Sequence, residues 1–309
     1  RNGPEDQRVT TGGSAGMVTD RKIIISNGIT SVELTAAPYT VQETKGFDRL
    51  EIEHVKSQGF DQDGATLINS YVLPREMEII GQMQAHTTAQ MQMLRDKLQS
   101  LFVPKQELIV THYYGGTNRV IKAVTEKSPK FDFTEVAPVQ QYTVSLLAMD
   151  PYWRDQTETL IAVANVVGGF HFPLVIPKNR GVHFGIKSSS LIAKVYNRSS
   201  IKVGMQITFI AGGIVKNPQL FNVNKRTFIK LLCTMEAGEK IVIQTGQDNT
   251  VTRVKSGISE DYIGKIDLAG EGNTFLELDP GDNLFRYAAD EGESFLKTRI
   301  QFYNRYPGV

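Results

Sequence analysis

The sequence predicts a mainly β protein of two domains, of which only the first carries an α-helix. The chain has 309 residues, enough for two domains that each bury a core. Hydrophobic residues make up 40% and charged residues 22% of it, as in ordinary globular proteins and unlike disordered chains. Apolar and polar residues alternate along most of the chain, which is typical of strands with one buried face, and a helical stripe occurs once.

Alternation between Lys22 and Asp155 predicts short antiparallel strands bounded by Gly, Pro and Asp. Leu50–Val55 is one such run. Leu108–Tyr114 and Asn118–Thr125 are predicted to form a hairpin, because Gly115-Gly116 between them tolerates the positive φ angles of a tight turn.

One segment of the first domain, Thr88–Phe102, has the periodicity of a helix. Thr87 and Gln90 fit a capping box at its start, and Pro104 disfavours helix beyond its end. Its apolar residues fall on one face: Met91, Leu94, Leu98 and Leu101.

Turn signals and composition divide the chain into four parts. Residues 1–16 are Gly-rich and lack an apolar core, so they are interpreted as a flexible leader or a cloning remnant. Residues 17–158 form the first domain, 159–185 a linker and 186–309 the second domain. The linker begins with nineteen uncharged residues, Thr159–Pro177, but their Asn, Gly and Pro residues argue against a membrane-spanning helix.

Strand patterns with frequent turns predict a β-sandwich for the second domain. The last pattern is the clearest, since Lys297, Arg299 and Gln301 alternate with three residues suited to a buried face. The predicted strands are Leu191–Tyr196, Met205–Ala211, Thr227–Cys233, Lys240–Thr245, Thr274–Leu278, Asn283–Ala288 and Lys297–Tyr303.

Charge and side-chain chemistry point away from several function classes. With 34 basic and 33 acidic residues the formal net charge is +1, so the chain has no overall field for nucleic acid or a membrane surface. We therefore expect neither sequence-specific nucleic-acid binding nor membrane insertion. Cys233 is the single cysteine, which excludes an intramolecular disulfide and a multi-cysteine zinc site, and the five histidines lie far apart. No metal or cofactor is expected.

The sequence predicts no catalytic residues. Paired carboxylates such as Glu277 with Asp279, or Glu260 with Asp261, would suit a glycosidase, but Asp279-Pro280-Gly281-Asp282 is typical of a turn. Asp61-Gln62-Asp63-Gly64 resembles the start of a calcium loop but lacks the later Glu, so it too is interpreted as a turn. A non-enzymatic binding or structural protein remains.

Eight segments stand out by their sequence and by their order along the chain: Tyr71–Met83, Leu94–Leu98, Gly115-Gly116, Arg119–Val124, Gln141–Trp153, Gly213–Asn222, Gly238–Ile243 and Leu278–Asn283. Together they extend over most of Lys22 to Gly308. In this order they resemble the distal tail (Dit) proteins of siphophages.

This resemblance implies a structural hub of the phage tail tip or baseplate, a virion component assembled in the host bacterial cytoplasm. It implies a hexameric ring of N-terminal domains, β-barrel or sandwich-like and similar to tail-tube proteins, that lines a DNA channel. A galectin-like C-terminal sandwich would project outward. The implied partners are other copies of the chain, the tail tube protein, a tail-associated lysin or tail-tip protein, and a receptor-binding protein. A tail-derived bacteriocin would use the same arrangement.

Two groups of residues are candidates for this function. Ser57–Ser70 is turn-rich and lies between two strand patterns, so Phe60, Asp61, Asp63 and Gly64 are candidates for a protein contact; a solvated hairpin tip is the alternative. Trp153 follows the last strand of the first domain and is a candidate anchor of the domain junction.

A second function remains open at this point. The C-terminal sandwich would recognise host cell-wall sugars through exposed aromatic side chains such as Tyr262 or Tyr287.

Overall fold

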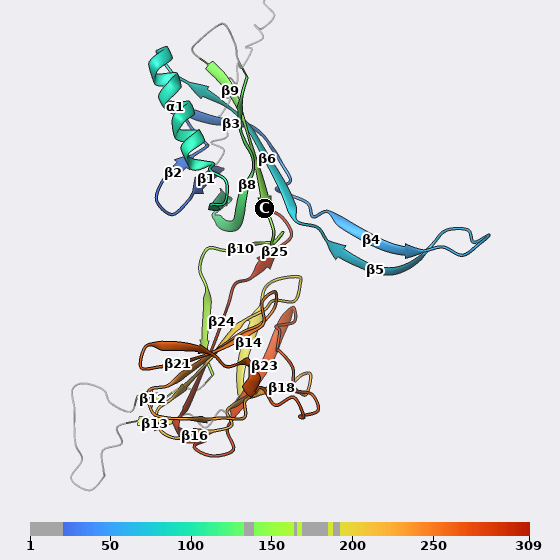
Figure 1. Cartoon of the computed structure of the whole chain (residues 1–309), viewed down its shortest axis with the longest axis vertical. Coiled ribbons are helices and arrows are strands. Elements are labelled where there is room, and N and C mark those ends of the chain that lie inside the picture. The colour runs from blue at the N-terminus through green and yellow to red at the C-terminus, as the bar shows by residue number, and fades with distance from the viewer. Residues whose placement is uncertain (1–20, 133–138, 164–165, 169–184, 188–191) are drawn as a thin grey trace, which may run out of the picture.

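The computed structural model describes residues 21–132, 139–163, 166–168, 185–187 and 192–309. It has an N-terminal β-rich domain with one α-helix, a C-terminal β-sandwich and a long hairpin that projects from the first domain (Figure 1). The predicted fold class, mainly β with one helix, is confirmed. The predicted leader, residues 1–16, lies outside the described residues.

Antiparallel strands build the N-terminal sheet, and its path leaves β2 and β3 at the two ends. Its order is β2 (Ser31–Glu33), β1 (Lys22–Ser26), β7 (Glu107–Tyr114), β8 (Thr117–Phe131), β9 (Val139–Ala148), β6 (Arg75–Gln84) and β3 (Tyr39–Lys45). β7 and β8 form the predicted hairpin, with φ angles of 55° at Gly115 and 76° at Gly116. The sheet curves, because side chains from β1 near one end and β3 at the other share a core.

The one α-helix of the described residues, α1 (Thr88–Leu101), covers this core, and the sequence predicts a helix at this place. Thr87 Oγ1 accepts a hydrogen bond from the Gln90 backbone N–H at 3.2 Å and so caps the helix. Leu98 and Leu101 are buried, and Tyr39 OH donates to the Leu94 carbonyl at 3.0 Å. The apolar stripe therefore packs onto the sheet.

The hairpin of β4 (Ile52–Ser57) and β5 (Thr66–Val72) extends away from the rest of the domain (Figure 1). Among the described residues its two strands pair only with each other, and every residue from Ile52 to Tyr71 is exposed. We call residues 52–72 the arm.

Two sheets face each other in the C-terminal domain, as predicted for a sandwich. The larger has the order β11 (Thr159–Ala162), β24 (Leu296–Phe302), β15 (Gln206–Ala211), β20 (Lys240–Gln244), β21 (Thr250–Lys255) and β22 (Ile258–Asp261). The smaller has the order β14 (Ile192–Asn197), β23 (Gly281–Ala288), β17 (Gln219–Asn222) and β18 (Thr227–Lys230). The remaining described elements are the strand pairs β12 (Val166–Gly168) with β13 (Gly185–Lys187) and β16 (Val215–Lys216) with β19 (Thr234–Met235), and the 3-10 helices η1 (Ile263–Lys265) and η2 (Glu293–Phe295).

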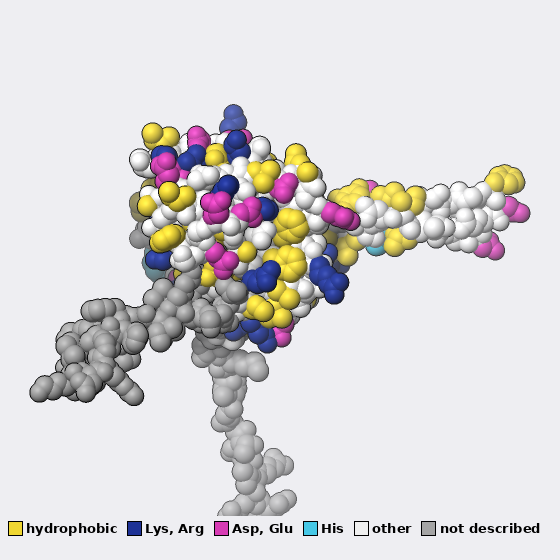
Figure 2. All heavy atoms as spheres, turned by 90° about the horizontal axis from the view of Figure 1, so that it is seen from below, with side chains coloured by type: hydrophobic (Ala, Val, Ile, Leu, Met, Phe, Trp, Pro, Cys, Tyr) yellow, Lys and Arg dark blue, Asp and Glu magenta, His cyan; other side chains and the backbone are white. Residues whose placement is uncertain are grey.

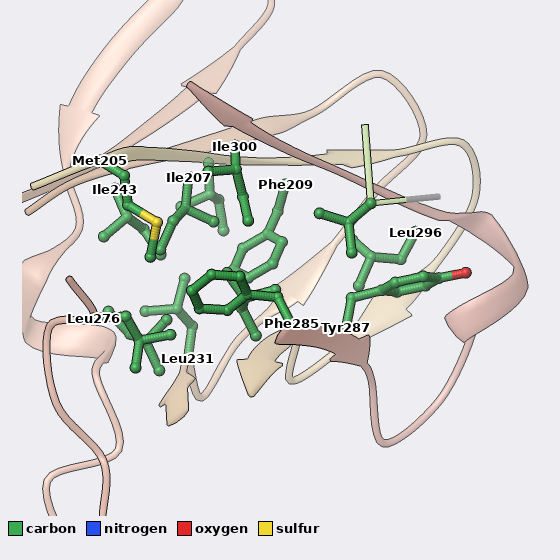
Figure 3. Close-up of a cluster of buried hydrophobic side chains, with 14 of the residues drawn as sticks. Met205, Ile207, Phe209, Leu231, Ile243, Leu276, Phe285, Tyr287, Leu296 and Ile300 are labelled. Atoms are coloured by element: carbon green, nitrogen blue, oxygen red, sulfur yellow. The ribbon is translucent and has the colours of Figure 1, made fainter. Parts of the chain in front are cut away.

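The inner faces of these two sheets form one apolar core. Ile207, Phe209 and Ile300 from the larger sheet lie opposite Phe285 and Tyr287 from the smaller one (Figure 3). β24 shows the predicted alternation, since its even-numbered side chains are buried and the intervening ones are not.

The structure differs from the sequence analysis at three places. Thr159–Ala162, the start of the predicted linker 159–185, is strand β11, because it pairs with β24 and adds an edge to the larger sheet. The predicted strand Thr274–Leu278 is not one: its alternating apolar residues are buried, but its backbone makes only isolated bridges. Arg305–Tyr306, within the predicted second domain, is β25, which returns to the first domain.

Candidate functional site

Apolar side chains stand on both faces of the arm. Residues paired across a hairpin point to the same face, so Ile52 with Val72 occupies one face and Tyr71, beside Glu53, the other. The register shifts by one residue at Ile68, so Leu67 pairs with Lys56 and shares the face of Ile52, whereas Val55 shares the face of Tyr71. Leu67 is 59% exposed and Val55 40% exposed. Figure 2 shows hydrophobic side chains along the arm and at its end.

Such a surface is typical of an element that another molecule covers. A two-stranded hairpin with no third strand or helix against it is marginally stable in water. Exposed apolar patches on soluble proteins mark interaction sites, whereas scattered apolar residues do not. The arm therefore has the properties of a docking element. Its large exposed apolar residues are Ile52, Val55, Phe60, Leu67, Ile68 and Tyr71.

The four contact residues predicted from the sequence lie together at the tip of the arm. Phe60 is fully exposed, and Asp61 and Gly64 have positive φ angles of 60° and 78°. Gln62 closes the turn, because its Oε1 accepts from the Gly59 N–H at 2.9 Å. The described residues contain no cluster of three side chains able to bind a metal, at the tip or elsewhere.

Arg75, which the sequence analysis did not single out, fixes the base of the arm. Its side chain is 4% exposed and donates to five backbone carbonyls. Three precede the arm, one precedes β10 (Trp153–Asp155), and one follows β25: Gly46, Phe47, Arg49, Pro151 and Pro307. A planar guanidinium suits this role because it carries five N–H donors in a fixed geometry. Burial lowers the pKa of Arg75, but an arginine remains charged in a protein.

Trp153 lies next to Arg75, because both side chains donate to the Phe47 carbonyl. It is completely buried in the N-terminal core, and its Nε1 donates to the Phe47 carbonyl at 3.1 Å. Its backbone pairs with Tyr306 of β25. The indole thus packs where the chain enters and leaves the second domain. This position suits an anchor of the domain junction, but the anchoring role of Trp153 stays a prediction.

His112 packs against two aromatic rings. Its ring centroid lies 6.1 Å from that of Trp153 and 6.0 Å from that of Phe47. It accepts a hydrogen bond from Arg21 Nε at 3.1 Å, so the imidazole is neutral at that nitrogen. Burial, together with the nearby positive charges of Arg21 and Arg119, lowers the pKa of His112 to about 4. A charged imidazole is therefore excluded from this core at neutral pH.

The two domains are joined by two chain crossings. β10 pairs with β8 and β25, so the sheet of the first domain includes a strand from the end of the second. Asn304 Nδ2 donates to Asp155 Oδ2 at 2.8 Å, and Arg305 forms an ion pair with Asp150. Arg119 lies over the Tyr306 ring at 4.0 Å from its centroid. These polar contacts position the sandwich relative to the arm.

The outward side chains of β6 and β9 include no basic residue, whereas the neighbouring strands place Lys45 opposite Glu78, Lys127 opposite Ser145 and Lys130 opposite Thr143. Along β6 and β9 the outward side chains form cross-strand pairs such as Gln82 with Gln141 and Ile80 with Thr143. Glu76 and Glu78 are the charged residues on these two outward rows, and neither row contains a lysine or arginine.

The aromatic residues proposed for sugar binding do not form an exposed platform. Tyr287 is 2% exposed and lies in the sandwich core (Figure 3), so stacking on a sugar is excluded for it. Tyr262 is half-buried beneath Arg253, whose guanidinium carbon lies 5.2 Å from the ring centroid. Cys233 is half-buried, and burial raises the pKa of its thiol to about 11, which opposes reactivity.

The carboxylates considered for catalysis have structural partners. Asp279 pairs with Lys225 at 2.6 Å, and Glu260 with Arg253 at 3.5 Å. Asp261 Oδ1 accepts from the Ile263 N–H at 3.1 Å. Across the part of the chain that the structure describes, no helix is long and apolar enough to cross a membrane.

Comparisons with known proteins relate this architecture to phage tails. Residues 31–148 match the phage tail protein RIFT-related domain family. The Dit protein of phage SPP1, a paradigm of the hub of the adsorption apparatus in phages that infect Gram-positive bacteria, has a similar structure. Its TM-score is 0.66 at 12% identity, over 93% of this chain and 99% of that one.

Two chains from the activated baseplate of phage P2 are similar as well. The Ca form gives a TM-score of 0.54 and the Sr form 0.52, each at 10% identity over 94% of this chain and 99% of the other. No curated protein sequence matches the chain. Residues 31–148 thus match a phage tail RIFT-related domain, and the chain shares the fold of the Dit protein of phage SPP1, in agreement with the resemblance found in the sequence.

Proposed function

We propose that this protein forms a ring that serves as the hub of a phage tail tip, and that the arm is the contact that closes the ring. The observation that carries the proposal is the arm, which exposes Ile52 and Leu67 on one face and Val55 and Tyr71 on the other. Repeating one contact between identical subunits gives a closed ring when the rotation closes. In such a ring, the neighbouring subunit would cover the apolar side chains of each arm.

The base of the arm supports this role. A flexible arm would lose conformational entropy on docking, whereas one held at a fixed exit angle loses less. Arg75 binds three carbonyls in the segment leading into β4, so the arm leaves the domain in a set direction. Tip residues Phe60, Asp61, Asp63 and Gly64 are then the part of the arm that reaches furthest from its own domain.

The polar face of β6 and β9 is the surface that we assign to the DNA channel. Binding to DNA phosphates depends on lysine and arginine, and the outward rows of these strands carry neither. Amides and hydroxyls such as those of Gln82, Gln141 and Thr143 offer DNA hydrogen bonds without positive charge. The lysines that flank these rows, Lys45, Lys127 and Lys130, each form an ion pair with a carboxylate of the chain, which reduces their attraction for phosphates. We expect the ring to be a hexamer in the virion.

The proposed partners follow from this placement. The ring would stack on the tail tube protein through the N-terminal domains and meet a tail-associated lysin or tail-tip protein on its other side. The sandwich, held by two crossings at the junction, would carry a receptor-binding protein. The description of the SPP1 Dit protein as an adsorption-apparatus hub supports such an arrangement.

Negative-stain imaging of a variant pair tests the arm as the ring contact. We expect closed rings with a central hole for the wild type and single particles for the variant with Leu67→Asp and Ile68→Asp. Leu268→Asp is the matched control, because Leu268 is 93% exposed but lies in the sandwich. Rings that persist in the arm variant, or that are lost in the control as well, would refute the assignment.

A further inference from the structure

A groove of about 570 Å³ lies between the larger sheet of the sandwich and the N-terminal domain. Its floor is the outward face of the larger sheet around Gln206. Asp150 and Arg154 of the first domain form one wall. The loop after β20, with Asp248, lines it too. The groove has the size of a site for a small ligand, and the proposed ring does not use it.

A directed row of amides crosses the floor of this groove. Gln206 stands opposite Gln244 on one neighbouring strand and Gln301 on the other. Gln244 Nε2 donates to Gln206 Oε1 at 2.6 Å, and Gln206 Nε2 donates to Gln301 Oε1 at 3.0 Å. Gln301 Nε2 in turn donates to Glu158 Oε2 at 2.8 Å.

The carboxylate at the end of the row fixes the direction of every amide. An ionised carboxylate only accepts hydrogen bonds, so Gln301 must turn its NH₂ group towards Glu158 and its oxygen towards Gln206. The same orientation is then imposed on Gln206 and Gln244. Gln206 and Gln301 each use one N–H and one lone pair within the row, and Gln244 uses one N–H, so every amide keeps a second N–H and at least one lone pair. Neighbouring strands lie about 4.8 Å apart, so these free donors and acceptors recur at that spacing.

The charges around the groove point to an uncharged ligand. Lys122 is paired with Glu107 at 2.8 Å, and Arg305 is paired with Asp150. Arg154 lies over the Tyr303 ring, 4.8 Å from its centroid. The cations that line the groove are thus engaged within the chain, which leaves no cluster to hold a phosphate or another anion.

We propose that this groove binds a neutral saccharide through the amide row. Sugar hydroxyls are both donors and acceptors and occur in adjacent pairs, so they match a row in which fixed N–H groups and lone pairs alternate. The half-buried Tyr303 adds an amphipathic side wall. This site differs from the aromatic sites at Tyr262 and Tyr287, and it does not depend on ring formation.

Ligand-observed saturation-transfer NMR on the full-length chain tests the proposal. The probes are soluble neutral oligosaccharides of hexoses and N-acetylhexosamines, with polyglycerol phosphate as the charged comparison. We expect a signal from a neutral oligosaccharide and none from the polyanion. Gln206→Ala breaks the row at its centre and is expected to weaken binding roughly tenfold, as the loss of one or two hydrogen bonds implies.

Two further variants sharpen the result. Gln206→Glu keeps the shape but loses the NH₂ donor, so it should weaken binding as well. Gln92→Ala, on helix α1 far from the groove, should leave binding unchanged. The absence of a signal from every neutral probe, binding that survives both Gln206 variants, or a preference for the polyanion would overturn the proposal. Particle mass measured on the same samples reports the ring separately, so failure of the saccharide site and failure of the hub are distinguishable.

Discussion

Replacing Arg75 by methionine removes the five-carbonyl cluster at the base of the arm while keeping a long side chain. Hydrogen bonds from a charged donor contribute about 1.5–3 kcal/mol each, but the burial of the guanidinium offsets much of their sum. We expect Arg75→Met to lower the free energy of unfolding by about 3–5 kcal/mol, since five buried carbonyls lose their donor. For a domain of this size that corresponds to a fall in Tm of about 10 °C.

Chemical denaturation followed by tryptophan fluorescence measures this loss, because Trp153 is the single tryptophan and lies in the same core. Arg75→Lys should recover little of the stability, since a point-like ammonium cannot reach five carbonyls in one plane. Arg286→Met, at an exposed arginine in β23, is the control and should cost less than about 0.5 kcal/mol. A loss below about 1 kcal/mol for Arg75→Met would refute the reasoning that this cluster holds the arm and the junction together.

Four further predictions concern other parts of the chain. The pKa of His112 is about 4 in the fold and about 6.5 when unfolded, so protonation favours unfolding. The neutral His112 contributes fully to the free energy of unfolding above pH 6.5, and this contribution falls by up to about 3 kcal/mol as the pH drops towards 4. In chemical denaturation at several pH values, His112→Gln should lack this part of the pH dependence. Trp153→Ala should cost about 3–5 kcal/mol and loosen the junction, and unchanged limited proteolysis between residues 168 and 185 would count against the latter. Phe60→Asp should weaken ring formation without changing Tm, because the side chain is fully exposed in the described part of the chain; a lower Tm would contradict this. Cys233 should react with iodoacetamide at pH 8 far more slowly than a free thiol, because burial raises its pKa to about 11; rapid alkylation would disagree.

Local sequence signals predicted the elements that depend on nearby residues. The helix Thr88–Leu101 agrees with its apolar stripe and its Thr87 cap, and the β7–β8 hairpin agrees with Gly115-Gly116. β11 was not predicted, because its run Thr159–Ala162 merges with the Gly- and Pro-containing residues that follow it. Its strand character depends on β24, which lies far away in sequence.

The junction shows why the functional surfaces were harder to predict. Arg75 occupies the first position of a strand and has no local partner in the sequence, yet it contacts carbonyls up to 232 residues away. The amide row likewise joins Glu158, Gln206, Gln244 and Gln301, which share a level of the sheet only after the strands pair. Ser57–Ser70 was predicted as a turn-rich stretch between two strand patterns, with a solvated hairpin tip as the alternative. The pairing of residues 66–70 within β5 and the exposure of both faces become visible only in the structure.

Light scattering over a range of concentrations measures the mass of the full-length protein in solution and so decides whether the arm closes a ring. We predict a discrete ring mass, that of six 34.4 kDa chains, which falls to the monomer mass when Leu67 and Ile68 are replaced by aspartate. A monomeric mass at every concentration, or an oligomer of unchanged mass in the arm variant, would contradict the assignment of the arm as the ring contact.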